Sequence, residues 1–431
     1  MDKVKAFFSK VASNPQVRKK LWATLFIFFI ARAFVAVPVP GIDTAQLSAL
    51  FDDNQFLGML NVFAGGTLAT FSLVALGVSP YITSSIVFQL LAMVFPKLKE
   101  LQKDGERGKA KLNQYTKLAS LPIAIVQSIS MIVLLQSQNL LTTDSIFSIV
   151  TIVISLVAGA FIMLWFGELI TAHGLGNGVS MMMVLGIISQ FPTQVMQLFA
   201  AAPGFSVIEY IITIAIFVGI LLVIGLVIYI NEARRNVPIQ YAKRMHGNRV
   251  SGGQRTFFPI KVNSVGVMPI IFAVTMMSFP SFLGGVLSTF QNETLSNFGQ
   301  QITMLFNEES LFYMGFYFAI VFAFSYFSAI IFFNAEDISN ELKKSGAFVP
   351  GIRPGSQTKN FLAAVVQRLT FIDAIFLGFI AVMPFLLQRL TGIGALAIGG
   401  TSLLILVSVL LEMNKSVEGM AVAQNYDQFQ V

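Results

Sequence analysis

The sequence predicts an all-α membrane protein with ten transmembrane helices, and three observations predict it. The chain of 431 residues is 55% hydrophobic and only 11% charged, which is typical of membrane proteins. Its apolar residues gather in stretches of about 20, the length that crosses a bilayer as a helix, without the weak alternation of a β-barrel. Its 28 Lys and Arg residues lie almost entirely between these stretches. The predicted spans are 21–37, 73–95, 117–135, 147–166, 179–199, 208–230, 262–283, 311–333, 369–387 and 395–413.

Basic residues mark one face of the membrane. Six Lys or Arg residues lie in 3–20, seven in 97–117, seven in 234–261 and five in 343–368, followed by Lys415. Pairs of predicted spans separate these segments, and the outer loops carry almost no Lys or Arg. Because cytoplasmic loops collect positive charge, we expect a multi-pass protein of the cell (cytoplasmic) membrane with both termini cytosolic. The net charge of +7 reflects either this topology with anionic lipid, or docking of a negatively charged partner.

Five predicted spans lie in each half of the chain. An odd number per half reverses the orientation of the second half, as an inverted-repeat architecture requires. This interpretation rests on the span count alone, because no residue-by-residue repeat stands out. The expected parts are a cytosolic amphipathic helix in 1–20, an N-terminal half in 21–200, a C-terminal half in 201–413 with long cytosolic loops 231–261 and 334–368 that fold and project, and a tail in 414–431.

Segment 58–70 (GMLNVFAGGTLAT) is apolar but too short to cross a membrane. Non-helical backbone at membrane depth is tolerated only where it is buried in protein or lines a watery cavity. The segment is therefore either an ordinary outer loop or a short re-entrant helix that dips into the centre of the bundle.

Enzymatic signatures are missing from the sequence. The chain has no cysteine, which excludes disulfides and thiolate chemistry. His173 and His246 show no metal-ligand spacing, and the glycines of 174–178 follow a span and lack the lysine of a phosphate loop. We therefore expect no catalytic residue, no cofactor and no metal, and a protein that is not an enzyme.

Polar side chains inside the spans are few. Gln89, Gln127 and Asn263 occupy spans two, three and seven. Each forms either an ordinary interhelical hydrogen bond or, with the others, a polar seam between helices that separate. Asp373 lies near the start of span nine, where we expect it to be hydrated at the cytosolic boundary. The shortage of central acidic and basic groups argues against an ion-coupled carrier.

Long sequence blocks resemble the SecY family of protein-conducting channels over nearly the whole chain. They are 61–91, 167–180, 241–244 with 259–273, 342–354 and 399–404. The resemblance implies ten helices in two inverted, pseudo-symmetric halves that open sideways between spans two and three on one side and spans seven and eight on the other. In that case Gln89, Gln127 and Asn263 form the polar seam of this lateral gate.

The resemblance also implies a plug and a central constriction. Segment 58–70 matches the plug, with Asn61, Phe63, Gly65, Gly66 and Leu68. A ring of aliphatic side chains excludes ions by dewetting and offers no hydrogen bond to a passing peptide; without the resemblance, each of these residues would be assigned to core packing. The matching positions are Val78, Ile82, Val179, Met183, Ile271 and Ile405.

The two long cytosolic loops carry the basic residues that the resemblance assigns to partner docking, although a solvated basic loop is the alternative. These residues are Arg353, Arg235, Lys243, Arg244 and Arg249. The implied partners are the SecA motor ATPase, the ribosome, a SecE-like clamp subunit, a SecG-like small subunit, membrane lipid, and secretory and membrane protein substrates with signal sequences.

Three positions depart from the family pattern. Asp373 stands where a glycine is usual, Asn248 replaces a loop arginine, and the tail after Lys415 lacks the common basic ending. The sequence as a whole predicts the pore-forming subunit of the general secretion channel, which passes unfolded polypeptides outward and releases apolar segments into lipid. The alternatives are a secondary transporter of a small solute with an inverted-repeat fold, and a docking platform without a pore.

Overall fold

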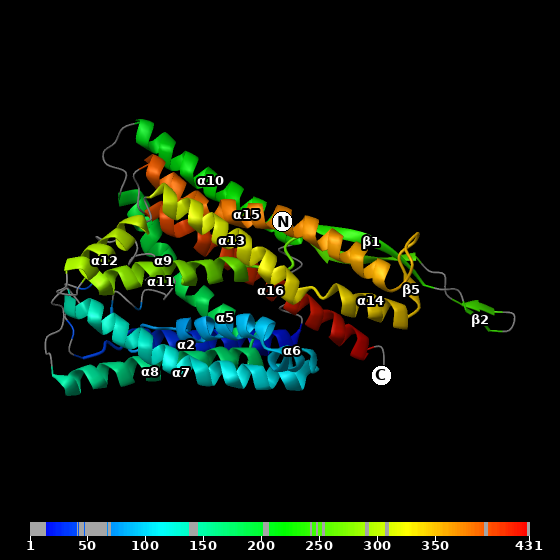
Figure 1. Cartoon of the computed structure of the whole chain (residues 1–431), viewed down its shortest axis with the longest axis horizontal. Coiled ribbons are helices and arrows are strands. Elements are labelled where there is room, and N and C mark those ends of the chain that lie inside the picture. The colour runs from blue at the N-terminus through cyan, green and yellow to red at the C-terminus, as the bar shows by residue number, and fades with distance from the viewer. Residues whose placement is uncertain are drawn as a thin grey trace.

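The computed structural model describes residues 14–40, 42, 47, 67, 70–137, 145–200, 207–241, 244–246, 249–251, 255–288, 293–306, 310–391 and 395–428. Most of the described chain is helical, and the long helices run roughly parallel to the longest axis of the molecule (Figure 1). The spans predicted from apolar composition are thus helices.

Most helices up to residue 200 form one side of the bundle, at the bottom of Figure 1, while α9 (Gly178–Ala200) runs through its middle. The first begins just after Asn14, whose side chain accepts hydrogen bonds from the N–H groups of Gln16 and Val17 (3.0 and 3.3 Å) and so caps the helix. The helices are α2 (Pro15–Val35), α5 (Ser79–Val94), α6 (Pro96–Lys103), α7 (Gly105–Ser137), α8 (Ile146–His173) and α9 (Gly178–Ala200).

The helices after residue 206 form the other side, and α9 packs against the last of them. A buried cluster that includes Tyr317, Leu377 and Phe385 holds this second set together. The helices are α10 (Val207–Glu232), α11 (Met268–Ser288), α12 (Glu293–Leu305), α13 (Leu311–Phe332), α14 (Ala335–Lys344), α15 (Ser356–Thr391) and α16 (Ala395–Gln428).

Two small sheets stand at one end of the bundle. Strands β1 (Arg234–Tyr241), β4 (Arg255–Lys261) and β5 (Ala347–Phe348) form an antiparallel sheet in the order β4–β1–β5. Strands β2 (Arg244–His246) and β3 (Arg249–Ser251) form a hairpin that extends beyond it (Figure 1). Because β5 comes from the second long loop, the two loops pair into one folded unit.

This unit has an apolar core of its own. Val237 and Ile239 of β1 are buried together with Val349 of the second loop and Leu362 of α15. The alternation of buried and exposed residues along β1 follows the period of two expected of a strand with one covered face. The two long loops therefore fold together, as we expected from their sequence.

All the described basic segments lie at the same end of the bundle, hereafter the basic end. Figure 1 shows α6, β1, α14 and the C-terminal end of α16 at this end. The helices alternate in direction along the bundle, which returns the chain to the basic end after every second long helix. This arrangement agrees with the charge pattern from which the topology was predicted.

Each predicted span overlaps one described helix. By length and composition, four helices in the described part of the chain can cross a membrane, or five if the bent pair α5 and α6 is one span. Others, such as α9 and α11, carry shorter apolar segments. The chain is therefore a helical membrane protein with several spans.

The helices at predicted spans two and seven begin later than expected. The expected spans start at residues 73 and 262, but α5 starts at Ser79 and α11 at Met268. Just before each helix, Gly77 (φ 53°) and Gly266 (φ 72°) adopt the left-handed conformation that favours glycine. A proline then occupies the second helical position, where it is well tolerated. Apolar composition could not reveal these turns.

Two predicted elements lie outside the described residues. The first comprises residues 1–13 of the predicted amphipathic helix. The second is most of segment 58–70, including the five predicted plug residues Asn61, Phe63, Gly65, Gly66 and Leu68.

Candidate functional site

The six residues predicted to form the constriction lie in one hydrophobic cluster at the junction of the two sets of helices. They come from the start of α5, from α9, from the start of α11 and from α16. Ile405 is fully buried, Val78 and Ile271 are nearly so, and the other three are partly buried against them. The cluster members from the prediction are Val78, Ile82, Val179, Met183, Ile271 and Ile405.

A short internal repeat, missed in the sequence, leads into this cluster from both sides. Residues 77–82 read GVSPYI and residues 266–271 read GVMPII. In each copy a left-handed glycine and a proline frame the helix start, and the isoleucine N–H bonds back to the carbonyl of the valine (3.1 and 3.2 Å). The repeat adds Val267 as the counterpart of Val78, and Val267 packs against the same cluster.

The three predicted seam residues lie in different surroundings. Gln89 donates from Nε2 to Ser85 Oγ (3.2 Å) within α5. The Oε1 atoms of Gln89 and Gln127 are buried and have no hydrogen-bond partner. Asn263 instead donates from Nδ2 to Asn231 Oδ1 of α10 (2.9 Å). Among the three, only the two glutamines leave an unsatisfied acceptor that a rearrangement of α5 and α7 could satisfy.

Asp373 corrects one expectation. The sequence suggested a hydrated carboxyl near the membrane boundary, but the side chain is only 2% exposed and its Oδ1 has no hydrogen-bond partner. The reason is that α15 begins at Ser356, well before the predicted span, and packs closely along α13 at this level. The ring of Phe322 meets that of Phe371, two residues before the aspartate.

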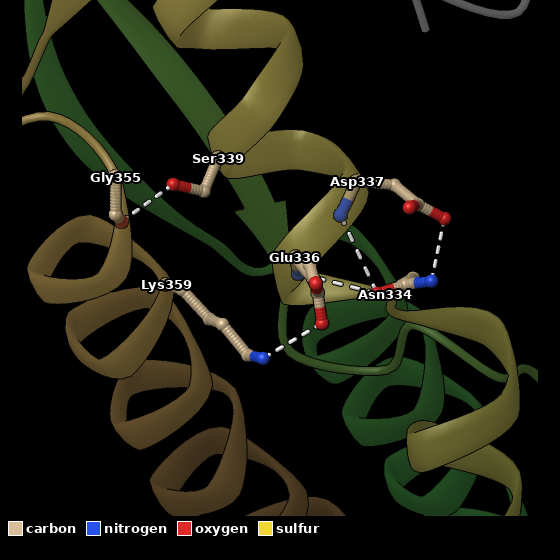
Figure 2. A network of polar contacts seen from close by, with 6 residues as sticks. All are labelled: Asn334, Glu336, Asp337, Ser339, Gly355 and Lys359. Atoms are coloured by element: carbon tan, nitrogen blue, oxygen red, sulfur yellow. Dashed lines mark hydrogen bonds and ion pairs between the residues drawn. The ribbon is translucent and has the colours of Figure 1, made fainter.

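Arg353 projects from a loop that is fixed by its backbone. Its side chain is exposed, while its carbonyl accepts a hydrogen bond from Thr358 Oγ1 (2.9 Å). Ser339 Oγ of α14 donates to the carbonyl of Gly355 (2.8 Å), and Lys359 pairs with Glu336 (2.7 Å; Figure 2). The loop is thereby tied to both α14 and α15, so the guanidinium is presented from a rigid base.

The other predicted docking residues lie on the neighbouring strands. Arg235 is exposed on β1. Arg244 and Arg249 are in the β2–β3 hairpin, where they pair with Ser251 and His246. Lys243 lies outside the described residues. In the described part of the chain, no group of three or more His, Asp and Glu side chains could hold a metal ion.

Several apolar helices around one aliphatic cluster, with a folded basic unit at one end, are typical of an α-helical membrane channel. The family model described as SecY matches residues 72–414. The chain belongs to the SecY family. The resemblance inferred from the sequence blocks is confirmed.

Similarities to known proteins support this family assignment. The chain is 36% identical over 442 residues to the protein translocase subunit SecY of Streptomyces scabiei, covering 98% of this chain and 99% of the relative. A solved structure described as that of a protein conducting channel matches with a TM-score of 0.62 at 18% identity, covering 93% and 92% of the two chains. Sec61 in a canine ribosome-channel complex gives 0.56 at 17% identity, with the same coverage. These relatives are channel subunits and not enzymes.

Proposed function

We propose that this SecY-family chain is the central pore-forming subunit of the general protein secretion channel. It passes unfolded polypeptides across the cytoplasmic membrane and releases apolar segments sideways into lipid. The observation that carries the proposal is the aliphatic cluster, to which both halves of the chain contribute. A constriction shared by two halves can widen when they part and close when they return.

The chemistry of the cluster suits a passage for polypeptides of any sequence. Branched aliphatic side chains hold no water and repel ions, and the flexible Met183 adapts to different shapes. None of the six side chains can hydrogen-bond to a passing segment, so none retains it. An apolar segment of about 20 residues that reaches the seam is more stable in lipid.

Ten spans in two inverted halves, 21–200 and 201–413, complete the proposal. The paired turns at 77–82 and 266–271 support it, because each precedes the second span of its half. Helices α5 and α11 run in opposite directions in Figure 1, as inverted halves require. Both termini and the basic end then face the cytosol, with 58–70 as the plug on the outer side.

Energy comes from partners at the basic end. Arg353, on its fixed loop, and the exposed Arg235 present guanidinium groups suited to bidentate contacts with carboxylates or phosphates. We assign this surface to a SecA-type motor ATPase and to the ribosome; the similarity to Sec61 in a ribosome-channel complex supports the second. A SecE-like clamp and a SecG-like small subunit complete the channel within the membrane.

Single cysteines test the path directly, because the chain has none of its own. Cysteines at Ile82, Val179 and Ile271 should crosslink to a secretory chain stalled in transit. A cysteine at Leu222, which is 69% exposed on α10 and faces lipid in this assignment, is the control and should not. If no cluster position crosslinks, the assigned path is wrong.

A further inference from the structure

Three basic residues lie close together at the basic end of the bundle, one after α10, one before α11 and one within α16. Arg234 opens β1 two residues after the end of α10, and Lys261 closes β4 shortly before α11. Lys415 lies in α16, just beyond the last predicted span. All three therefore stand at the level where these helices leave the hydrocarbon, and not on the loops that project further.

The three positive charges are close together. Arg234 and Lys261 are directly paired across β1 and β4, so their side chains leave the same face of the sheet. The side chain of Lys261 also lies within hydrogen-bond reach of Lys415. Like charges in such pairs repel, and strand pairs of this kind are destabilising.

The carboxylates near these residues do not neutralise them through ion pairs. The charge of Glu232 acts on Lys415, and Glu412 and Glu418 lie one turn away from it on α16. In the described part of the chain, no carboxylate forms an ion pair with Arg234, Lys261 or Lys415. The arrangement therefore favours an anion that the described residues do not supply.

Lys415 is held in this position from the other side of its helix. Two residues further on, Val417 is buried against Val17 of α2 and Leu175 of the α8–α9 loop. Residues two apart on a helix face nearly opposite directions, so this contact turns Lys415 toward the sheet. Burial, followed by the charge of Lys261, lowers the pKa of Lys415 below its ordinary value.

We propose that Arg234, Lys261 and Lys415 bind the anionic headgroup of a phospholipid in the cytosolic leaflet. A guanidinium and two ammonium groups can bind one phosphate through charge-assisted hydrogen bonds. The depth of the site, just outside the predicted spans that end at 230, begin at 262 and end at 413, favours lipid over a partner in the cytosol. The bound phosphate offsets the repulsion among the three positive charges. It contacts all three side chains and so connects α16 to the sheet. The inference rests on the membrane orientation proposed above.

Native mass spectrometry of the full-length protein with phosphatidylglycerol or phosphatidylcholine tests the site. The variant is Arg234→Gln/Lys261→Gln/Lys415→Gln. We expect it to bind phosphatidylglycerol about a hundredfold more weakly than the wild type, since each lost charge-assisted hydrogen bond to the phosphate costs at least a factor of about five. The unmutated protein should prefer phosphatidylglycerol over phosphatidylcholine.

The matched control removes three exposed lysines from the same end, as Lys97→Gln/Lys99→Gln/Lys109→Gln. It should retain phosphatidylglycerol within about twofold of the wild type, because general attraction by surface charge is weak and screened. Equal loss in the two triple variants would overturn the proposal, as would equal retention of the two lipids by the unmutated protein. Displacement of the lipid by millimolar inorganic phosphate would assign the cluster to a free anion instead.

A second measurement needs no variant. Acetylation of Lys415 in the wild-type protein, followed by mass spectrometry, should slow severalfold with phosphatidylglycerol vesicles and not with phosphatidylcholine vesicles, relative to Lys97. Protection by an oligoribonucleotide but not by phosphatidylglycerol would assign the cluster to a nucleic-acid partner and overturn the lipid site. Neither measurement depends on translocation, so a protein that binds the lipid but secretes nothing would count against the proposed function alone.

Discussion

Asn263 donates a hydrogen bond from Nδ2 to the Oδ1 of Asn231, 2.9 Å away, and so joins the chain before α11 to the end of α10. Asn231 in turn donates to Ser408 Oγ of α16 (3.3 Å), and Asn263 Oδ1 accepts the N–H of Gly266 (2.6 Å). The network therefore fixes the left-handed turn that starts α11. It acts within the C-terminal helices.

Replacing Asn263 should consequently destabilise those helices. Asn263→Ala removes two hydrogen bonds of a side chain that is 5% exposed, which should lower the free energy of unfolding by about 1–3 kcal/mol. Asn236→Ala, at an exposed position of β1, should change it by less than about 0.5 kcal/mol. Denaturant titration in detergent measures both. Unchanged stability together with altered crosslinking between α5 and α11 would contradict this structural role and favour a role of Asn263 in the predicted seam.

The junction of α8 with the turn before α5 depends on Gly159. A Cβ at this position would overlap the carbonyl oxygen of Leu73, and backbone atoms cannot move aside as a flexible side chain can. We expect Gly159→Ala to lower the midpoint of thermal unfolding and to cost about 1–3 kcal/mol through overpacking.

Gly225→Ala is the matched control for that change. Gly225 is also helical, in α10, but a Cβ there meets nothing within 4 Å. The substitution should be neutral or stabilising by roughly 0.5–1 kcal/mol, because glycine weakens a helix interior. Equal effects at the two glycines would show that the close approach of α8 to Leu73 is not a packing constraint.

Arg353 should contribute to partner binding and not to stability. Its backbone carbonyl holds the loop through Thr358, whereas its side chain is free in solvent. We expect Arg353→Ala to weaken ribosome binding by the purified protein about tenfold or more, as arginine contacts at interface centres do, with unfolding unchanged. Arg353→Lys should recover part of this loss, because lysine keeps the charge without the planar fork.

The comparison for Arg353 is Arg255→Ala, which removes an exposed charge from β4 of the same unit. Binding assays with purified ribosomes and with the motor ATPase should show a small effect here. If the two alanine variants lose binding equally, general charge and not the Arg353 loop recruits the partner.

Periodicity and charge predicted the helices and the basic end because both depend on composition averaged over many residues. Leu21 to Met413 could thus be divided into spans that each meet a helix. The starts of α5 and α11 could not be predicted this way, since they depend on single left-handed glycines. The pairing of β5 with β1 was also hidden, because it joins two loops that lie far apart in the sequence.

The cluster residues were named only through the resemblance, because an aliphatic residue at a constriction looks like any core residue. The repeat at 77–82 and 266–271 was a signal in the sequence that could have identified Val267. The environment of Asp373 was not predictable, since the packing of α13 against α15 determines it. The seam of Gln89, Gln127 and Asn263 remains a prediction; the side-chain oxygens of the two glutamines are buried without a hydrogen-bond partner.

Ion conductance of the purified protein in planar bilayers tests the pore most directly. Ile82→Gly and Ile271→Gly open the aliphatic cluster, and Leu222→Gly makes the same change on an exposed face of α10. We predict steady ion leakage through both cluster variants, and none through the control or the wild type. Leakage that is unchanged in both cluster variants would contradict a pore lined by these residues.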